Sequence, residues 1–237
     1  IKKFEQDLDG YQRYALSQWP SNIGHLRCDT SISSSYIIVE DVGQDTEGGA
    51  YRAGILSPGT GSLSLEVWLN AAAPITGTEN VQVITQKMSG SDGYTLYLTG
   101  SEVRFSVISG STTNEVFAPM EFGTDKYIAV SFDRSSFTGS LTIMTGSSTE
   151  FPVAVQSSSI GIFGSIDIGE GVLSIASGSI AGKITEYFTG SMDDVRVWKK
   201  TKTLQSLSSS FNIKQHAESG LAALYRFNGS GSADTSN

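Results

Sequence analysis

The stretch SLSLEVWL, residues 62–69, alternates strictly between two kinds of side chain. Leu or Val stands at every second position, and Ser62, Ser64, Glu66 and Trp68 fall between them. Successive side chains of a β-strand point to opposite faces of the sheet. The stretch therefore predicts a strand with one face in an apolar core and the other face turned away from it.

The same alternation returns along most of the chain. It is found at residues 94–98, 102–107, 128–133, 141–143, 195–197 and 225–227. Gly-Ser pairs such as Gly90-Ser91 and Gly110-Ser111 separate the runs, and both residue types favour turns. Many short strands separated by such turns predict an all-β antiparallel sandwich, or jelly roll. We expect one such domain over residues 31–237, preceded by an arm over residues 1–30.

Composition and charge exclude several classes of protein. The chain has 237 residues and a net charge of −8, which argues against binding nucleic acid by phosphate neutralisation or docking on an anionic membrane. No apolar run approaches the length of a membrane-spanning helix. Cys28 is the sole cysteine, so an internal disulfide is impossible, and we expect a small buried side chain. With only His25 and His216 in addition, a His/Cys zinc site is not expected.

Two segments have helical spacing. In the arm, Phe4, Leu8, Tyr11, Ala15 and Trp19 recur at intervals of three and four, and Pro20 would end a helix there. This stripe either packs on its own domain or docks on another subunit, and the second alternative predicts a homo-oligomer. Residues 203–211 repeat the spacing over one or two turns.

Six segments, in order, resemble the strands of laminin-G-like, concanavalin A-like lectin and glucanase domains. The most specific is FTGSMDDVRVW, residues 188–198, which resembles the pattern fxGxiDdvRiW. SLEVWL at 64–69 and KYIAVSFD at 126–133 resemble SxEAWV and WxHvAvtfD. The others are residues 84–96, with ITQK followed by GYTL, then 141–146 and 220–228. The resemblance implies a concanavalin A-like β-sandwich.

Some relatives in this group are glycosidases, but their catalytic motif is missing from this chain. The glucanase branch carries Glu-x-Asp-x-x-Glu on one strand, which places two carboxylates on one face at the separation that retaining hydrolysis needs. The adjacent Asp193 and Asp194 would point to opposite faces of a strand. We therefore expect no enzymatic activity.

Asp193 also has a second interpretation that follows from the resemblance. In the glucanase branch, the corresponding Asp often holds a structural calcium ion together with backbone carbonyls, which suits the oxygen ligands that Ca²⁺ prefers. The alternative is a carboxylate that accepts backbone N–H groups at the end of a strand. Asp193 is thus the candidate metal ligand, with Ca²⁺ as the candidate cofactor.

Glu66, Trp68, Tyr97 and Arg104 are the candidate ligand-binding residues. Each lies on the face opposite the apolar stripe of its strand. If the strands are neighbours, these residues form an aromatic and charged cluster of the kind that binds sugars. The alternative for Trp68 is buried packing, and for Tyr97 and Arg104 an ordinary solvent-exposed face.

Two functions follow from the resemblance and the composition. The first is a non-catalytic structural and adhesion module of a larger assembly, such as a phage virion decoration, fibre or tail protein that binds cell-surface glycans. The lone cysteine, the abundant Ser and Gly and an N-terminus unlike a secretion signal favour it. The second is a secreted carbohydrate-binding module attached to a glycoside hydrolase. Both place the protein on a virion surface or outside the cell.

Overall fold

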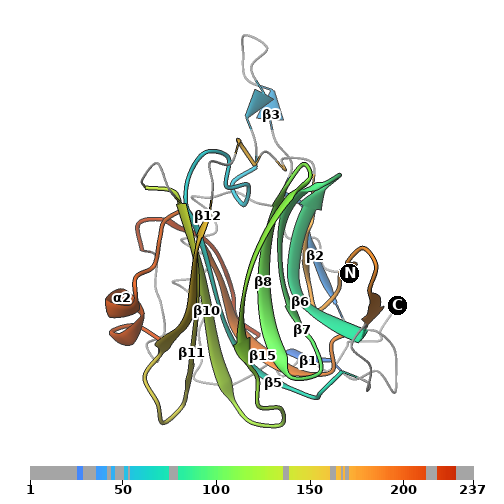
Figure 1. Ribbon diagram of the computed structural model, residues 1–237, viewed down its shortest axis with the longest axis vertical. Helices are drawn as coiled ribbons and strands as arrows, with labels where there is room; N and C mark the ends of the chain where they lie inside the picture. Colours follow the sequence, from blue (N-terminus) through green and yellow to red (C-terminus); the bar gives the residue numbers. More distant parts are fainter. Residues whose placement is uncertain are drawn as a thin grey trace, which may run out of the picture.

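Two seven-stranded sheets pack face to face and enclose the apolar core (Figure 1). The computed structural model describes residues 26–28, 36–41, 44–45, 51–52, 54–74, 80–135, 139–160, 164–166, 168, 171–211 and 218–227. We name the sheets by one strand of each, as the β5 sheet and the β7 sheet. Every pairing in the described residues is antiparallel except that of β14 with β6.

The β5 sheet joins strands that are far apart in the sequence. Its order is β1 (Leu26–Cys28), β15 (Gly190–Trp198), β5 (Leu63–Ala71), β10 (Lys126–Asp133), β11 (Gly139–Ser147) and β12 (Val153–Ile160), and β16 (Leu221–Tyr225) pairs with β15.

The β7 sheet is built mainly from consecutive hairpins. Its order is β2 (Ile37–Val39), β13 (Leu173–Ile175), β6 (Asn80–Ser89), β7 (Asp92–Leu98), β8 (Glu102–Ser109) and β9 (Thr112–Pro119), and β14 (Ile184–Glu186) pairs with β6. The ribbon of β3 (Gln44–Asp45) and β4 (Tyr51–Arg52) stands at one end of the sandwich (Figure 1). The all-β sandwich expected from the sequence is therefore confirmed.

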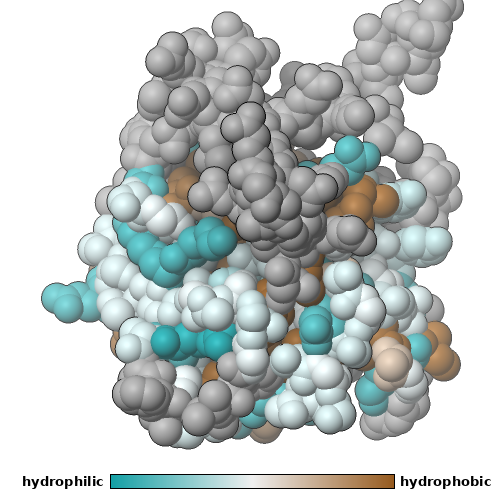
Figure 2. All heavy atoms as spheres, turned by 90° about the horizontal axis from the view of Figure 1, so that it is seen from above, coloured by the Kyte–Doolittle hydropathy of each residue, from teal (hydrophilic) through white to brown (hydrophobic). Residues whose placement is uncertain are grey.

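The core lies between the sheets and is made by the apolar stripes of the alternating strands. Leu63, Leu65, Val67 and Leu69 of β5 are all buried in it, together with residues such as Phe105 from the β7 sheet. Burial of each such side chain stabilises the fold by about 1.5–3 kcal/mol. Seen from the end that carries β3, most of the described surface is pale to teal, in keeping with a chain rich in Ser and Gly (Figure 2).

A segment that we call the strap, residues 199–211, covers the part of the outer face of the β5 sheet that is formed by β5, β10 and β11. It contains the short helix α2 (Leu204–Ser208), which lies outside this sheet (Figure 1). Thr203 caps the helix by accepting a hydrogen bond from the Ser206 N–H at 3.3 Å. The helix predicted at residues 203–211 is thus present but shorter, and the remaining residues continue as turns.

Parts of the expected arm fall outside the described residues. These include Phe4, Leu8, Tyr11, Ala15 and Trp19, and also the side chain of Cys28, so predictions for them stay predictions. Residues 26–28 form β1 and pair with β15, which ties the end of the 1–30 stretch to the β5 sheet. No helix in the described part of the chain is long and apolar enough to cross a membrane.

Candidate functional site

Trp68 is a packing residue beneath the strap. Its ring lies 5.2 Å from that of Tyr127 and 6.0 Å from that of Phe211, centroid to centroid. The indole Nε1–H donates to the Phe211 carbonyl oxygen at 3.2 Å. Strap backbone also bonds to the sheet, because the Lys202 N–H donates to the Ser64 hydroxyl at 2.9 Å. The outer face of the β5 sheet is therefore closed at Trp68.

Glu66 belongs to a buried ionic network on the same face. Only 1% of its side chain is exposed, and its Oε2 accepts from the Tyr127 hydroxyl at 2.7 Å and from Arg196 Nη1 at 2.8 Å. Arg196 Nη2 donates to Asp194, which also binds Arg226. Burial, reinforced by the charge of Glu66, raises the pKa of the Tyr127 phenol. Because Glu66 and Arg196 are buried, this network offers no contact surface to a sugar.

Asp193 lies where β15 meets the segment that follows β16. Its Oδ1 accepts the Asp194 N–H at 2.8 Å and the Phe227 N–H at 3.1 Å. Burial raises the pKa of this carboxyl group, while the two backbone hydrogen bonds oppose the shift. Within the described ranges, no group of three or more His, Cys, Asp or Glu side chains could hold a metal ion. Calcium at Asp193 stays a prediction, and these contacts favour the alternative of a hydrogen-bond acceptor.

Tyr97 and Arg104 lie together on the outer face of the β7 sheet, on the opposite side of the sandwich from Glu66 and Trp68. They are register partners on β7 and β8, and Arg104 is in turn opposite Phe117 on β9. The four residues predicted to form one cluster are thus divided between two sheets. Alternation places each of them outward, but it does not determine which sheet a strand joins.

The β7 face carries a compact site that we call the Arg104–Phe117 site. It consists of Tyr97, Glu102, Arg104, Glu115 and Phe117. The Tyr97 hydroxyl donates to Glu115 Oε2 at 2.5 Å, and Arg104 Nη1 donates to Glu115 Oε1 at 2.5 Å. Arg104 Nε and Nη2 both donate to Glu102 Oε2, at 2.9 and 2.6 Å. The guanidinium carbon lies 5.2 Å from the centroid of the Phe117 ring.

The site is partly open to solvent. The Arg104 side chain is 31% exposed and Phe117 is 39% exposed, whereas Tyr97 is 6% exposed. Ile180 packs against Tyr97 and its neighbours Val81 and Val83. The Phe117 ring and the Arg104 guanidinium are therefore accessible, and the Tyr97 side chain beside them is buried.

The pKa values of Arg104 and Tyr97 are both raised by their surroundings. Burial lowers the pKa of Arg104, but the hydrogen bonds and charges of Glu102 and Glu115 outweigh this effect and raise it. Burial, with the hydrogen bond to Glu115, raises the pKa of the Tyr97 phenol. Arg104 is therefore a cation and Tyr97 a neutral donor near neutral pH. Chemically, the site offers an apolar ring face with donors and acceptors at its edge.

Glu102, Glu115 and Phe117 were not among the sequence-predicted site residues. A signal for two of them exists in the two-residue turn Gly110-Ser111, where Gly110 has a φ of +59°. A turn of this length sets the register of its hairpin, which places Phe117 opposite Arg104 and Glu115 opposite Ser106. Glu102 is two residues before Arg104, on the same face of β8.

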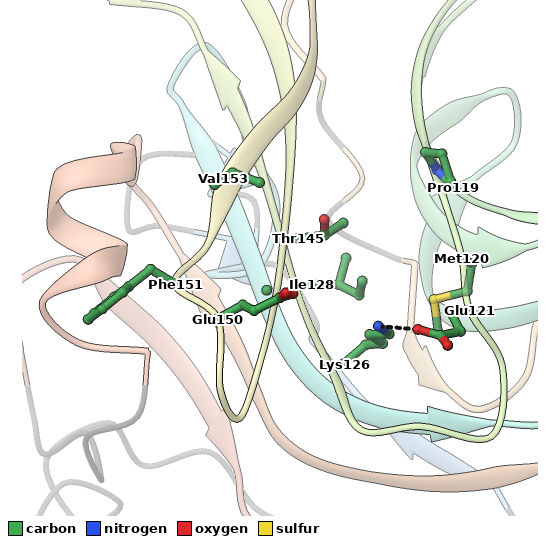
Figure 3. Close-up of a pocket in the computed structure, with 10 residues that line it drawn as sticks. Pro119, Met120, Glu121, Lys126, Ile128, Thr145, Glu150, Phe151 and Val153 are labelled. Carbon is green, nitrogen blue, oxygen red and sulfur yellow. Dashed lines mark hydrogen bonds and ion pairs between the residues drawn. The ribbon is translucent and has the colours of Figure 1, made fainter.

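A concavity away from the Arg104–Phe117 site, which we call the edge cleft, opens where the two sheets meet near β9 and β12 (Figure 3). It encloses about 570 Å³ and is lined by Pro119, Met120, Glu121, Lys126, Ile128, Thr145, Gly146, Glu150, Phe151 and Val153. Lys126 Nζ binds Glu121 Oε2 at 2.7 Å. The edge cleft is lined mainly by apolar residues, whereas four of the five residues of the Arg104–Phe117 site have hydrogen-bonding side chains, so a hydroxyl-rich ligand suits the latter better.

Comparisons with known proteins give the fold. No family model and no curated protein matches the chain. Among solved structures, the CBM40 domain of the Ruminococcus gnavus IT-sialidase, bound to α2,3-sialyllactose, has a TM-score of 0.52 at 13% identity over 80% of this chain and 98% of that one. A Bacteroides ovatus protein described as carbohydrate-binding has a TM-score of 0.56 at 17% identity, covering 89% of this chain and 53% of that one.

The binding domain of botulinum neurotoxin serotype G is also similar, with a TM-score of 0.52 at 14% identity over 80% of this chain and 50% of that one. The chain thus spans about half the length of this domain and of the Bacteroides protein. At these identities the likeness shows the sandwich fold. The finer resemblance to laminin-G-like domains stays a prediction.

Proposed function

We propose that the protein is a non-catalytic glycan-binding module and that the Arg104–Phe117 site is its binding surface. The observation that carries the proposal is the Phe117 ring, which is partly exposed and has over it a guanidinium that is bound by two carboxylates. Sugars present apolar C–H faces and hydroxyl rims. The ring suits the first, and Arg104 with its two Glu partners suits the second.

Arg104 keeps hydrogen-bonding capacity for a ligand. A guanidinium has five N–H donors, and the described contacts of Arg104 with Glu102 and Glu115 use three of them, which leaves one on Nη1 and one on Nη2. Around Glu66 and Trp68, in contrast, the outer face of the β5 sheet is covered by the strap. The similar R. gnavus domain, solved with a sialylated sugar, adds support for glycan binding as the role of this sandwich.

Two settings for the module are carried forward as proposals. One is an adhesion module on a virion, and the other is a secreted carbohydrate-binding module attached to a glycoside hydrolase. An open site on one sheet serves either setting equally well. The sequences that flank the chain would distinguish them, since coat or fibre sequence favours the first and a catalytic domain favours the second.

A glycan array probed with matched Phe→Ala variants tests the function. Phe117→Ala removes the stacking surface and should lower the affinity for any bound glycan about tenfold or more, equivalent to about 1.4 kcal/mol. Phe151→Ala is the control, because Phe151 is also an exposed phenylalanine but lies at the edge cleft. Arg104→Lys keeps the charge but loses the planar fork, and should weaken binding as well.

Equal losses in the Phe117 and Phe151 variants would move the binding surface away from the Arg104–Phe117 site. An array on which the wild type binds no glycan would contradict the function. The screen should be run with Ca²⁺ and again with a chelator. The contacts of Asp193 lead us to expect the same binding in both buffers, and loss on chelation would establish a working calcium site.

The arm supports a second proposal, that the protein is a homo-oligomer held by the stripe Phe4, Leu8, Tyr11, Ala15 and Trp19. Deleting residues 1–22 removes the stripe and leaves β1 intact. We expect light scattering on the eluting protein to show a smaller assembly than the full chain forms. An unchanged mass would exclude the arm as the oligomer contact.

A further inference from the structure

The charges of the Arg104–Phe117 site do not balance. Arg104 is the one cation among its five residues, and Glu102 and Glu115 both bind it directly. The site therefore carries a net charge of −1 when both carboxylates are ionised. An anionic ligand would approach a surface whose single positive group is already shared between two negative ones.

The hydrogen bonds of Arg104 also disfavour an anionic ligand. Arginine holds carboxylates best through two parallel N–H groups. The edge formed by Nε and Nη2 is occupied by Glu102 Oε2, and Nη1 is bound to Glu115 Oε1. Glu102 and Glu115 already use three of the five N–H groups of Arg104, so a ligand carboxylate could bind only the two that remain, one on Nη1 and one on Nη2. It would also lie close to both glutamates, and one repulsion between unit charges about 4 Å apart in water lowers affinity about fivefold.

A neutral sugar meets neither obstacle. Its hydroxyls can donate to carboxylates and accept from the guanidinium, so both signs of charge in the site are useful to it. Hydrogen bonds to ionised groups are stronger than those between neutral groups. The apolar face of the same sugar can lie on the Phe117 ring, which is accessible beside Arg104.

We infer that the Arg104–Phe117 site selects uncharged, hydroxyl-rich glycans and discriminates against acidic ones that carry sialic acid, uronic acid or sulfate. This inference rests on the proposed function and adds the ligand class to it. The chain would then share its fold with the sialyllactose-bound R. gnavus domain and differ from it in the charge of its ligand.

The test compares matched pairs of immobilised oligosaccharides, each neutral member beside the same oligosaccharide carrying one acidic group. The wild type should bind the neutral member of each pair at least about fivefold more tightly than the acidic member. Glu115→Gln removes one negative charge from the site, so the acidic members should gain about fivefold relative to the neutral ones. Glu102→Gln should also favour the acidic members. Because Glu115 and not Glu102 binds the Tyr97 hydroxyl, this second variant separates the effect of charge from a rearrangement around Tyr97.

Glu121→Gln is the matched control for the charge of the whole protein. It changes the net charge of −8 by the same amount, but Glu121 lies at the edge cleft and pairs with Lys126. We expect this variant to leave the acidic-to-neutral ratio unchanged. A ratio that rises equally in the Glu115 and Glu121 variants would assign the selectivity to the overall field and overturn the inference.

Two further outcomes separate the inference from the function on which it rests. Equal or tighter binding of the acidic members by the wild type, lost in Phe117→Ala, would overturn the selectivity and leave the glycan-binding site in place. No binding to either member of any pair would contradict the proposed function itself, and the inference with it.

Discussion

Lys87 and Asp41 form an ion pair inside the sandwich. Their side chains are almost completely buried, and Nζ lies 3.2 Å from Asp41 Oδ2. Nζ also donates to the Gly171 carbonyl oxygen, and the Leu56 N–H donates to Asp41 Oδ2 at 2.9 Å. Burial lowers the pKa of Lys87, while the charge of Asp41 opposes that shift. Each charge is thus compensated only as long as its partner is present.

Removing one member of this pair should be far more harmful than its net contribution suggests. Lys87→Met leaves a buried carboxylate without its cation and should cost about 3–5 kcal/mol of unfolding free energy. The double variant Lys87→Met with Asp41→Asn removes both charges and should recover part of the loss. Urea denaturation of the wild type, both single variants and the double variant gives the coupling, and purely additive losses would refute it.

The environment of Asp41 also explains a glycine that the sequence alone does not. A Cβ atom at Gly54 would lie 2.3 Å from the Asp41 carboxylate carbon, well inside contact distance. A larger residue at position 54 would therefore push Asp41 away from Lys87. No local sequence pattern reveals the ion pair that Gly54 leaves room for, because Asp41 and Lys87 are more than forty positions apart.

Helix α2 illustrates how a very short element can be held by packing. Five residues are too few for a helix to be stable alone. Leu207 is fully buried against Tyr127, Ala129 and Met144, whereas Leu204 in the same helix is exposed. The β5 sheet thus supplies the stability that the helix lacks, and the helix covers Tyr127, Ala129 and Met144 on the outer face of the sheet.

The two leucines of α2 make a matched pair of variants. Leu207→Ala should lower the unfolding free energy by about 2–5 kcal/mol, because it leaves a cavity between the helix and the sheet. Leu204→Ala makes the same chemical change at the surface and should cost less than about 0.5 kcal/mol. Comparable losses in chemical denaturation would mean that α2 does not depend on its contact with the sheet.

At the scale of elements, sequence reasoning succeeded where the pattern is local. The alternation of residues 62–69 predicted β5 and its inward leucines, and the spacing of residues 203–211 predicted the position of α2. The pairing of β5 with β15 could not be read in this way, because more than one hundred residues separate them. For that reason Trp68 and Tyr97 were expected in one cluster but lie on opposite sides of the sandwich.

The candidate site shows the same division. Tyr97 and Arg104 were selected from the outward face of their strands, and their adjacency is confirmed by the register of β7 and β8. Phe117 could have been added from the two-residue turn at Gly110-Ser111. The sequence could not show that the strap covers part of the β5 sheet, because no pattern in residues 199–211 indicates which surface they contact.

The whole molecule should become unstable in alkali through its buried tyrosines. Burial raises the pKa of Tyr94, Tyr97 and Tyr127, so they stay protonated in the fold above pH 10. In the unfolded chain they ionise near pH 10. Their contribution to stability is therefore complete below about pH 10 and is lost as the pH rises further, by about 1.4 kcal/mol per pH unit for each residue.

Urea denaturation at a series of pH values from about 9 to 12 measures this loss. The absorbance of tyrosinate should report ionisation of the three buried residues only as the fold is lost. A protein equally stable at pH 9 and pH 11.5 would contradict the prediction, as would full tyrosine ionisation with an intact sandwich. Tyr97→Phe should reduce the slope by about one residue's share.

Because the strap covers part of the outer face of one sheet, the molecule has a distinct front and back. Copies attached through the side that carries the strap would all present the Arg104–Phe117 site outward. A shallow surface site of this kind holds each sugar weakly, but several copies facing one cell would act together, because the first contact raises the effective concentration for the next. The strap would then contribute to avidity without touching the ligand, since it determines which way each copy faces.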